Sequence, residues 1–488
     1  MNMIQNRFLV LHLLFYVLCY WQLTLSQISN NTCQRGDYNI GFGLSSSVHS
    51  AHNPSTNCFL SQCSNQSDSC RPSPTLCYIY RSADNQTYCA PGSLCEILEV
   101  CNTSSYRCSS NTSVCILNSC CSPKAICLPL IWTTLCPKII PCQLQFTPIL
   151  TYAAGNSPQY AVKGDFNSDS QVDLVITNKD DDTIRLYRNN GNGTFTIQRT
   201  IPTESNPERI AVGDFNNDNH LDLIITNLGN NSISLLLGDG NGNFALLTTF
   251  VVGYLLSDIA VGDFNQDGLS DIAVVIQGNN AIGVYLANGT TNSSSLRILP
   301  TDAVPHAIGL GDFNHDNLID IVVTNIGSNT ISIFLGQGDG NFTNQTTVSV
   351  GMIPVSIAVA DFTQDNRLDL AVVNFGSKTI SILSGDGTGN FTMTTNLLMS
   401  ASPWSIIASD LDSDNRTDLA VTNTDSAYIS VFLNLGSGSF SAEKIISTES
   451  SFPYGLIAGD FNNDARTDLV VTNNINATIS VLFNSCQS

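Results

Sequence analysis

The sequence predicts an all-β fold: a seven-bladed β-propeller of four-stranded blades, preceded by a small disulfide-rich region. The main observation is the phrase Gly-Asp-Phe-Asn-x-Asp, which recurs seven times, sometimes in a close variant, at steps of 49 or 50 residues. Its first Asp stands at Asp165, Asp214, Asp263, Asp312, Asp361, Asp410 and Asp460. Such a regular period indicates a repeat architecture.

Each period also holds four strand-like segments. In the second repeat these are 210–212, 223–225, 233–235 and a segment that starts at Phe244, after the glycine-rich turn 238–242. Apolar runs rich in β-branched residues are typical of strands buried on both faces. Four strands in about 49 residues fit a propeller blade. A solenoid of seven β units is the alternative.

The two ends of the repeat region predict a closed ring. The last repeat stops after its third strand, and residues 146–152 match the missing fourth strand, because Phe146 plus 49 residues is Phe195. We therefore expect this N-terminal strand to complete blade seven. Cys142 and Cys486 align with the same turn position. We predict a Cys142–Cys486 disulfide that fastens the ring.

The chain divides into residues 1–26, a signal peptide, 27–144, a Cys-rich region, and 145–486, the propeller. Arg7 followed by the apolar run 8–21 is typical of a secretory signal. The alternative, a signal anchor, needs a longer apolar run. We expect a secreted, extracellular protein with no stable membrane anchor.

The cysteines predict disulfides. Removal of the signal leaves 16 of the 17 cysteines, and fifteen of these lie between Cys33 and Cys142. In an exported chain this density favours a disulfide framework. A C-x₆-C-x₆-C pattern begins at Cys63 and again at Cys101, which suggests two tandem disulfide-knotted units. About fourteen N-x-S/T sequons along the chain predict a glycoprotein.

Each copy of the phrase continues into a loop with Asp, or in places Asn or Thr, at positions 1, 3, 5 and 9, which we call the Asp loop. The seven sets are Asp165, Asn167, Asp169, Asp173; Asp214, Asn216, Asp218, Asp222; Asp263, Asn265, Asp267, Asp271; Asp312, Asn314, Asp316, Asp320; Asp361, Thr363, Asp365, Asp369; Asp410, Asp412, Asp414, Asp418; and Asp460, Asn462, Asp464, Asp468. Ca²⁺ takes six to eight oxygen ligands from carboxylates, amides and backbone carbonyls. Positions 1, 3 and 5 supply side-chain oxygens, position 7 its carbonyl, and position 9 a bidentate carboxylate.

Turn formation by Asp and Asn is the alternative interpretation. Two like charges about 4 Å apart repel by roughly 4 kcal/mol at an effective dielectric of about 20, so three converging carboxylates are costly without a cation. We therefore predict up to seven bound Ca²⁺, with Mg²⁺ or Mn²⁺ less suited by ligand number. Thr363 weakens the fifth site, and the sequon at Asn415 places a glycan where it would crowd the sixth.

These loops and their period resemble FG-GAP/VCBS repeats, which occur in integrin α-subunit propellers and many secreted proteins. The resemblance covers residues from about 145 to 486 and leaves the Cys-rich region unrecognised. It implies a seven-bladed propeller with Ca²⁺ in the hairpin loops between the first and second strands. It also implies adhesion or extracellular binding to a protein or glycan. The chain lacks the membrane span and leg domains of an integrin, so receptor function of that type does not follow.

The face opposite the Asp loops is the predicted ligand face. A proline starts the first strand of six blades, and the residue after it varies. We expect a possible ligand face that includes Gln159, Glu208, His306, Trp404 and Tyr454. Unconstrained loop residues are the alternative.

No catalytic motif stands out, so the sequence favours a non-enzyme: a secreted, Ca²⁺-binding interaction or adhesion module. The alternative is an extracellular carbohydrate-active enzyme or a lectin on a propeller scaffold.

The charge balance supports the metal prediction. With 19 Lys and Arg against 40 Asp and Glu, the net charge is −21, which argues against nucleic acid and anionic membranes as partners. The seven loops hold 22 Asp, three in each plus Asp412, so the rest of the chain is nearly neutral. Seven Ca²⁺ would add +14 and leave about −7.

Overall fold

The computed structural model describes residues 144–287 and 295–485, and the backbone of five short strands between residues 77 and 129. The chain divides into two compact units, 1–140 and 141–488. The first unit contains two small antiparallel sheets, formed by β1 (Cys77–Arg81) with β2 (Thr87–Pro91), and by β5 (Ile126–Pro129) between β3 (Glu99–Val100) and β4 (Ser113–Ile116). The predicted signal peptide and the predicted Cys142–Cys486 disulfide lie outside the described residues.

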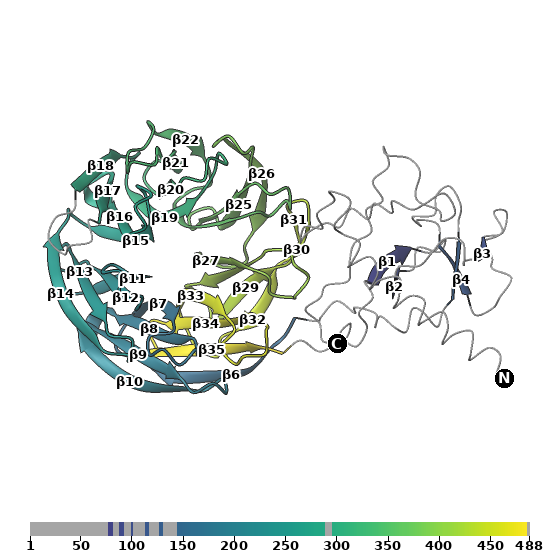
Figure 1. Cartoon of the computed structure of the whole chain (residues 1–488), viewed down its shortest axis with the longest axis horizontal. Helices are drawn as coiled ribbons and strands as arrows, with labels where there is room; N and C mark the ends of the chain where they lie inside the picture. The colour runs from purple at the N-terminus through teal and green to yellow at the C-terminus, as the bar shows by residue number, and fades with distance from the viewer. Residues whose placement is uncertain are drawn as a thin grey trace, which may run out of the picture. The chain divides into compact units, whose positions relative to one another are not determined.

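The second unit confirms the predicted fold class: seven four-stranded antiparallel sheets form a ring (Figure 1). The first strand of each blade contacts the first strands of both neighbouring blades, and the first strand of blade seven meets that of blade one, so the ring is closed. The first strands are β7 (Pro158–Gly164), β11 (Pro207–Gly213), β15 (Leu256–Gly262), β19 (Pro305–Gly311), β23 (Pro354–Ala360), β27 (Pro403–Ser409) and β33 (Pro453–Gly459).

The remaining strands follow outward in each blade. The second strands are β8 (Asp173–Asn178), β12 (Asp222–Asn227), β16 (Asp271–Ile276), β20 (Asp320–Asn325), β24 (Asp369–Asn374), β28 (Asp418–Asn423) and β34 (Asp468–Asn473). The third strands are β9 (Thr183–Asn189), β13 (Ser232–Gly238), β17 (Ala281–Leu286), β21 (Thr330–Phe334), β25 (Thr379–Gly385), β29 (Tyr428–Phe432) and β35 (Thr478–Asn484). The fourth strands are β10 (Phe195–Pro202), β14 (Phe244–Val251), β18 (Ser295–Pro300), β22 (Thr346–Ser349), β26 (Phe391–Leu398), β32 (Lys444–Ser447) and β6 (Phe146–Ala153).

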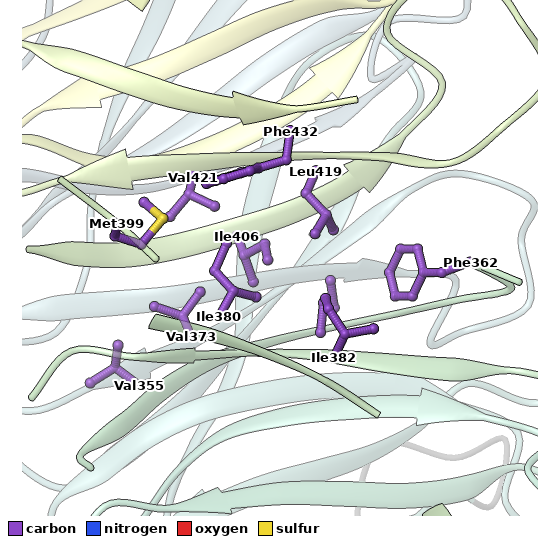
Figure 2. Close-up of a cluster of buried hydrophobic side chains, with 12 residues drawn as sticks. Val355, Phe362, Val373, Ile380, Ile382, Met399, Ile406, Leu419, Val421 and Phe432 are labelled. Carbon is purple, nitrogen blue, oxygen red and sulfur yellow. The ribbon is translucent and has the colours of Figure 1, made fainter. Parts of the chain in front are cut away.

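The hydrophobic core lies between the blades. Every residue of the seven second strands is buried, which explains their unbroken apolar runs. Seven apolar clusters fill the seven blade interfaces. Figure 2 shows the cluster between blades five and six, where Val373 and Ile382 of blade five face Ile406 and Leu419 of blade six. Each blade is therefore stabilised mainly by its neighbours.

The strand β6 closes the ring. It pairs antiparallel with β35, so that Ile479 lies opposite Tyr152 and Asn484 lies opposite Phe146. Blade seven thus combines three strands from the end of the repeat region with one strand from its beginning. A hydrogen bond from the Ser485 amide to the Gln145 carbonyl (2.9 Å) continues this pairing beyond the strands.

Regular helix is limited in the described segments to two short 3₁₀ turns, η3 (Lys179–Asp181) and η4 (Gln277–Asn279), each between a second and a third strand. Neither is long or apolar enough to span a bilayer, and the described residues contain no other candidate helix for a membrane crossing.

The closure can be tested at Phe146, which is 5% exposed and packs in the cluster between blades six and seven. We expect Phe146→Ala to lower the free energy of unfolding by about 3–5 kcal/mol, because it leaves a cavity in that interface. Chemical denaturation of the full chain in Ca²⁺ measures this loss. Leu246→Ala, at a side chain that is 59% exposed on β14, is the control and should change the free energy by less than about 0.5 kcal/mol. Equal effects of the two variants would show that β6 does not hold the ring closed.

Candidate functional site

The seven Asp loops stand on one face of the ring, which we call the loop face. Each loop follows a first strand and ends at position 9, which is the first residue of the second strand. Positions 4 and 6 have positive φ in all seven loops, between 59° and 83°. Alternation of left-handed residues with ordinary ones coils the backbone, so that the side chains at positions 1, 3 and 5 turn inward.

The carboxylate at position 1 folds its own loop. In the second loop, Asp214 Oδ1 accepts a hydrogen bond from the amide of Asp218 at 3.1 Å, and Oδ2 accepts one from Asn219 at 2.8 Å. The other six loops repeat both bonds at 2.8–3.2 Å. The position-1 oxygens are therefore held in place by backbone amides.

The carboxylate at position 9 is fully buried in every blade. In blade four, Asp320 Oδ2 accepts a hydrogen bond from the amide of Phe313, at position 2 of the loop, at 2.7 Å. Its Oδ1 accepts one from Gly336, just beyond the third strand, at 2.8 Å. The same pair of bonds occurs in the other six blades. Position 9 thus ties the loop to the sheet, a role that our sequence interpretation as a bidentate ligand did not include.

Burial also changes the acidity of these carboxyl groups. It raises the pKa of Asp173, Asp271 and Asp320 to about 6, and the pKa of Asp418 and Asp468 to about 7, although the two amide bonds oppose the shift. The loop carboxylates add to the shift, because they repel a further negative charge. A cation in the loop would act in the opposite direction and favour the ionised form.

The sixth loop brings its carboxylates closest together. Asp410, Asp412 and Asp418 each offer one oxygen, and these three oxygens lie within 4.8 Å of one another. Asp412 Oδ1 is buried and has no hydrogen-bond partner. Burial, and then the charges of Asp414 and Asp410, raise the pKa of Asp412 to about 6. Hard oxygen donors that converge around an unpartnered acceptor fit a divalent cation.

The other loops vary this arrangement at position 3. In four loops the Asn Nδ2 donates to the position-5 carboxylate, at 2.8–3.1 Å. Its Oδ1 accepts from the position-5 amide. In the fifth loop Thr363 offers a hydroxyl, which donates weakly to Asp361 at 3.4 Å. The fifth loop therefore has one amide oxygen fewer than the loops with Asn.

In three loops an arginine pairs with the position-5 carboxylate. The pairs are Arg188 with Asp169 (3.1 Å), Arg367 with Asp365, and Arg416 with Asp414. These side chains partly neutralise the first, fifth and sixth loops from outside.

The loops also hold the neighbouring blade. In six loops the carbonyl oxygen at position 2 accepts a hydrogen bond from the next blade, either from the end of its third strand or from the connection that follows. A glycine amide donates at 2.8–3.1 Å in four cases, Gly242 to Phe166, Gly340 to Phe264, Gly389 to Phe313 and Gly438 to Phe362. An asparagine side chain donates at 2.6–2.9 Å from Asn189 to Phe461, Asn434 to Phe362 and Asn484 to Leu411.

The aromatic ring at position 2 crosses the same interface. The Phe166 ring, for example, meets the Phe244 ring of blade two edge-on, with centroids 5.6 Å apart. Four further interfaces have such a pair, at 5.3–6.1 Å. These phenylalanines therefore belong to the core between the blades.

The opposite face, which we call the mouth face, consists of the second-to-third-strand turns and the connections that lead into the first strands. Here the ring of Trp404 packs against His306 (5.7 Å between centroids), Phe375 (5.9 Å) and Tyr454 (5.1 Å). Burial lowers the pKa of His306 to about 4, so its ring is neutral at pH 7. Its Nδ1 lies 2.8 Å from the carbonyl oxygen of Val355 and donates to it. Three of the five predicted ligand-face residues therefore form one aromatic cluster.

The other two predicted residues make polar contacts instead of aromatic ones. Gln159 is 4% exposed, and its side chain donates to the Ser157 carbonyl. Glu208 forms an ion pair with Lys179 at 3.2 Å.

Sequence reasoning missed the residues that continue the cluster, which stand one position further along the first strands. Tyr160 meets Tyr454 edge-on at 5.7 Å, and the guanidinium carbon of Arg209 lies 3.4 Å from the centre of the Tyr160 ring. Arg209 also pairs with Asp258 (3.6 Å) and donates to the carbonyl of Ser257 (3.0 Å). The signal in the sequence was a tyrosine, an arginine and an aspartate at one position of three successive inner strands.

A family model described as FG-GAP-like repeat matches six overlapping stretches, from the first Asp loop to the second strand of blade seven. The matched residues are 165–225, 216–274, 263–323, 312–372, 361–421 and 410–471, and together they span more than half of the chain. The chain belongs to the FG-GAP-like repeat family. Each FG-GAP match begins at or just after position 1 of one Asp loop and continues into the next repeat. No curated protein matches the chain in sequence.

Solved structures share the fold of these FG-GAP repeats. BBS1N, crystallised in complex with ARL6DN and soaked with lead, is 13% identical with a TM-score of 0.54, over 72% of this chain and 99% of its own. A functionally unknown protein from Desulfotomaculum acetoxidans is 14% identical with a TM-score of 0.50, over 64% of this chain and 94% of its own. At these identities the likeness shows the fold alone.

The role of position 9 in the FG-GAP loop can be separated from metal binding. We expect Asp320→Asn to lower the free energy of unfolding by about 1–3 kcal/mol, because the amide replaces one of two acceptors with a donor that faces a buried amide. The loss should appear in EDTA as well as in Ca²⁺. The control Asp316→Asn, at exposed position 5 of the same loop, should be nearly silent in EDTA. If Asp320→Asn has no effect in EDTA, position 9 acts through a metal alone.

Proposed function

We propose that this FG-GAP-repeat chain is a secreted, Ca²⁺-binding propeller that serves as an extracellular interaction or adhesion module, and that its ions are structural. The observation that carries the proposal is the sixth loop. Three carboxylate oxygens converge there within 4.8 Å, and a buried Asp412 oxygen lacks a partner. Backbone amides hold the corresponding position-1 and position-9 carboxylates in all seven loops.

The loop residues would hold the ion through carboxylates at positions 1, 5 and 9 and the side-chain oxygen at position 3. A bound Ca²⁺ supplies the positive charge that these carboxylates need when they approach one another. The chain itself transmits the effect, because position 2 contacts the next blade through its carbonyl in six loops and through an aromatic ring in five. An ion that fixes the conformation of a loop therefore also stabilises the interface between that blade and the next.

Bound Ca²⁺ is expected to contribute a large part of the free energy of unfolding. Extracellular Ca²⁺ modules bind with Kd values of about 10⁻⁴–10⁻³ M. At ten times Kd each ion adds about 1.4 kcal/mol to the free energy of unfolding, so seven ions add about 10 kcal/mol. This equals the net stability of a typical domain.

The role as an interaction module rests on the fold and on the mouth face. In the BBS1N structure a propeller of this fold was crystallised in complex with another protein. Here the mouth face carries an aromatic cluster, whereas the carboxylates of the Asp loops are engaged in hydrogen bonds within the chain. Secretion rests on the apolar N-terminal run and on the dense cysteines.

Removal of the metal tests the proposal. We expect EDTA to lower the melting temperature of the full chain by at least 10 °C, because the carboxylates then repel one another and the loops loosen. Excess Ca²⁺ should restore it, and equimolar Mg²⁺ should restore less. Calorimetric titration of the metal-free protein should show up to seven sites. If EDTA leaves the melting temperature unchanged, the proposed structural role of Ca²⁺ is wrong.

The fifth loop offers a gain-of-function test. We expect Thr363→Asn to increase the rise in melting temperature that Ca²⁺ produces, because it restores the amide oxygen present in five other loops. In EDTA the variant should melt with the wild type. Asp412→Asn should have the reverse effect in Ca²⁺, since it removes a carboxylate from the sixth loop. A Thr363→Asn variant whose Ca²⁺ response equals that of the wild type would contradict the assignment of position 3 as a ligand.

A further inference from the structure

The two faces of the ring differ in the apolar side chains that they expose. Among the described residues, fourteen large hydrophobic side chains are exposed. Eight of them lie on the outer fourth strands, two of these, Val251 and Leu398, at the last residue of their strand, and one, Leu435, stands on the loop face. The other five are in the turns and connections of the mouth face: Tyr254, Met352, Ile353, Phe452 and Ile475. The mouth face therefore carries nearly all the apolar surface outside the outer strands.

Four apolar residues at this face also occupy an unfavourable backbone conformation. The residue before the first strand has positive φ in six blades. In blades one and two it is Ser157 and Asn206, small polar residues that tolerate this region better. In blades three, four, five and seven it is Leu255, Val304, Ile353 and Phe452, with φ between 55° and 59°. A bulky or β-branched residue at positive φ is strained.

Hydrogen bonds from the surrounding structure hold these residues in the positive-φ conformation. The amides of Leu255, Val304 and Ile353 are each fixed by an asparagine side chain of the preceding blade, at 2.8–2.9 Å. Burial does not explain the choice of residue, since Ile353 is 40% exposed and Phe452 is 43% exposed. Apolar side chains kept at strained and exposed positions indicate contact with something outside the chain.

The strained connections join the aromatic cluster. Phe375 donates its amide to the carbonyl of Ile353, and Gly376 donates to that of Met352, both at 2.9 Å. The Phe375 ring packs on Trp404. Met352, Ile353, Phe375 and Trp404 therefore form one apolar strip from the connection into blade five to the cluster at the mouth. Trp404 Nε1 is buried in this strip and has no hydrogen-bond partner.

The mouth face that carries the strip is acidic as a whole. The turns and connections of the mouth face hold seven acidic residues and two lysines, which gives a net charge of 2 − 7 = −5. The acids are Asp180, Asp181, Asp182, Glu204, Asp302, Asp425 and Glu449, and the lysines are Lys179 and Lys378. Each lysine is already paired with a carboxylate, Lys179 with Glu208 and Lys378 with Asp425. Among the described residues the three-carboxylate cluster is on the loop face, so these acids are spread out and do not converge on an ion.

We propose that the mouth face docks a protein partner that presents a basic and apolar surface, with its apolar side chains on the Met352–Ile353–Phe375–Trp404 strip. This deepens the proposed function and rests on it in treating the chain as an interaction module. A second copy of this chain fits poorly, because two mouth faces of net charge −5 repel each other. A glycan fits less well, because three aromatic neighbours enclose the Trp404 ring and the rest of the strip is aliphatic.

A random twelve-residue peptide library displayed on phage, selected on the immobilised full chain in Ca²⁺, tests the proposal. We expect the selected peptides to be rich in Lys or Arg and in aliphatic or aromatic residues. Their affinity, measured by fluorescence anisotropy, should fall as salt rises from 50 to 300 mM, because screening weakens the charge attraction. Selection of acidic peptides, or of none, overturns the proposal.

Two double variants locate the binding surface. Met352→Ser with Phe452→Ser, at side chains 56% and 43% exposed, should weaken the selected peptides at least tenfold. The matched control Leu246→Ser with Ile445→Ser, 59% and 55% exposed on outer strands, should change their affinity by less than twofold. Equal effects of the two double variants overturn the mouth-face assignment.

The Ca²⁺ response is scored separately on the same proteins. Because both double variants leave the loop face untouched, EDTA should lower their melting temperatures as it does for the wild type. If EDTA does not change the melting temperature but the peptides still bind the mouth-face variant more weakly than the control variant, the structural role of Ca²⁺ is refuted and the docking surface is supported. If EDTA lowers the melting temperature but the peptides bind both variants equally well, the docking surface is refuted and the structural role of Ca²⁺ is supported.

Discussion

The buried carboxylate at position 9 of each Asp loop is the interaction on which the ring depends. It begins the second strand, accepts the amide of position 2, and accepts an amide at the end of the third strand. Position 2 then contacts the next blade through its carbonyl in six loops and through its ring in five. One buried group thereby connects the sheet of a blade to its loop, and the loop to the neighbouring sheet. Because the core lies between blades rather than inside them, this connection positions most of the buried apolar surface.

The same carboxylate is the reason for proposing a cation in the loops. The two amides that position 9 accepts point at its two different oxygens, and Asn would place an NH₂ donor at one of these positions. A carboxyl group is therefore buried in every blade. Positions 1 and 5 bring further carboxylates toward it. Burial first, and then the charges of these carboxylates, raise the pKa of Asp173 and Asp468, and the mutual repulsion is an electrostatic cost. Arginines relieve it in part in three loops. A divalent ion would relieve it in all seven, and would act at the point where the loop meets the next blade.

The sequence predicts the fold closely because the repeat imposes it. A period of 49 residues with four apolar segments leaves few architectures, and the match between Phe146 and Phe195 predicts which strand completes blade seven. The loop positions could also be predicted, since Asp at alternating positions implies convergence. The spacing of the Asp residues in the sequence does not show which group donates a hydrogen bond to each carboxylate oxygen. That position 9 is clamped by two amides depends on the end of the third strand, sixteen residues away.

The mouth cluster escaped prediction for a related reason. Tyr160, Arg209 and Asp258 occupy one position in three successive blades, so no repeat shows more than one of them. Their contacts arise only when the ring closes and places the blades around a common axis. The strained residues before the first strands were equally hidden, because most precede a proline and the sequence alone suggests an ordinary extended residue there.

A sevenfold repeat gives seven nearly equal blades, so whatever distinguishes this chain from another such ring lies where the repeats differ. On the loop face the differences are small changes in a shared set of oxygen ligands, such as Thr363 or Asp412. On the mouth face they change the chemistry: Ser157 and Asn206 give way to Ile353 and Phe452 at the same backbone conformation. The loop residues that each blade needs in order to pack on the next are thus nearly the same in all seven repeats, whereas the mouth-face residues differ from repeat to repeat. Strained and exposed apolar residues do not help the chain to fold, and this is the physical reason for proposing that the mouth face meets a partner.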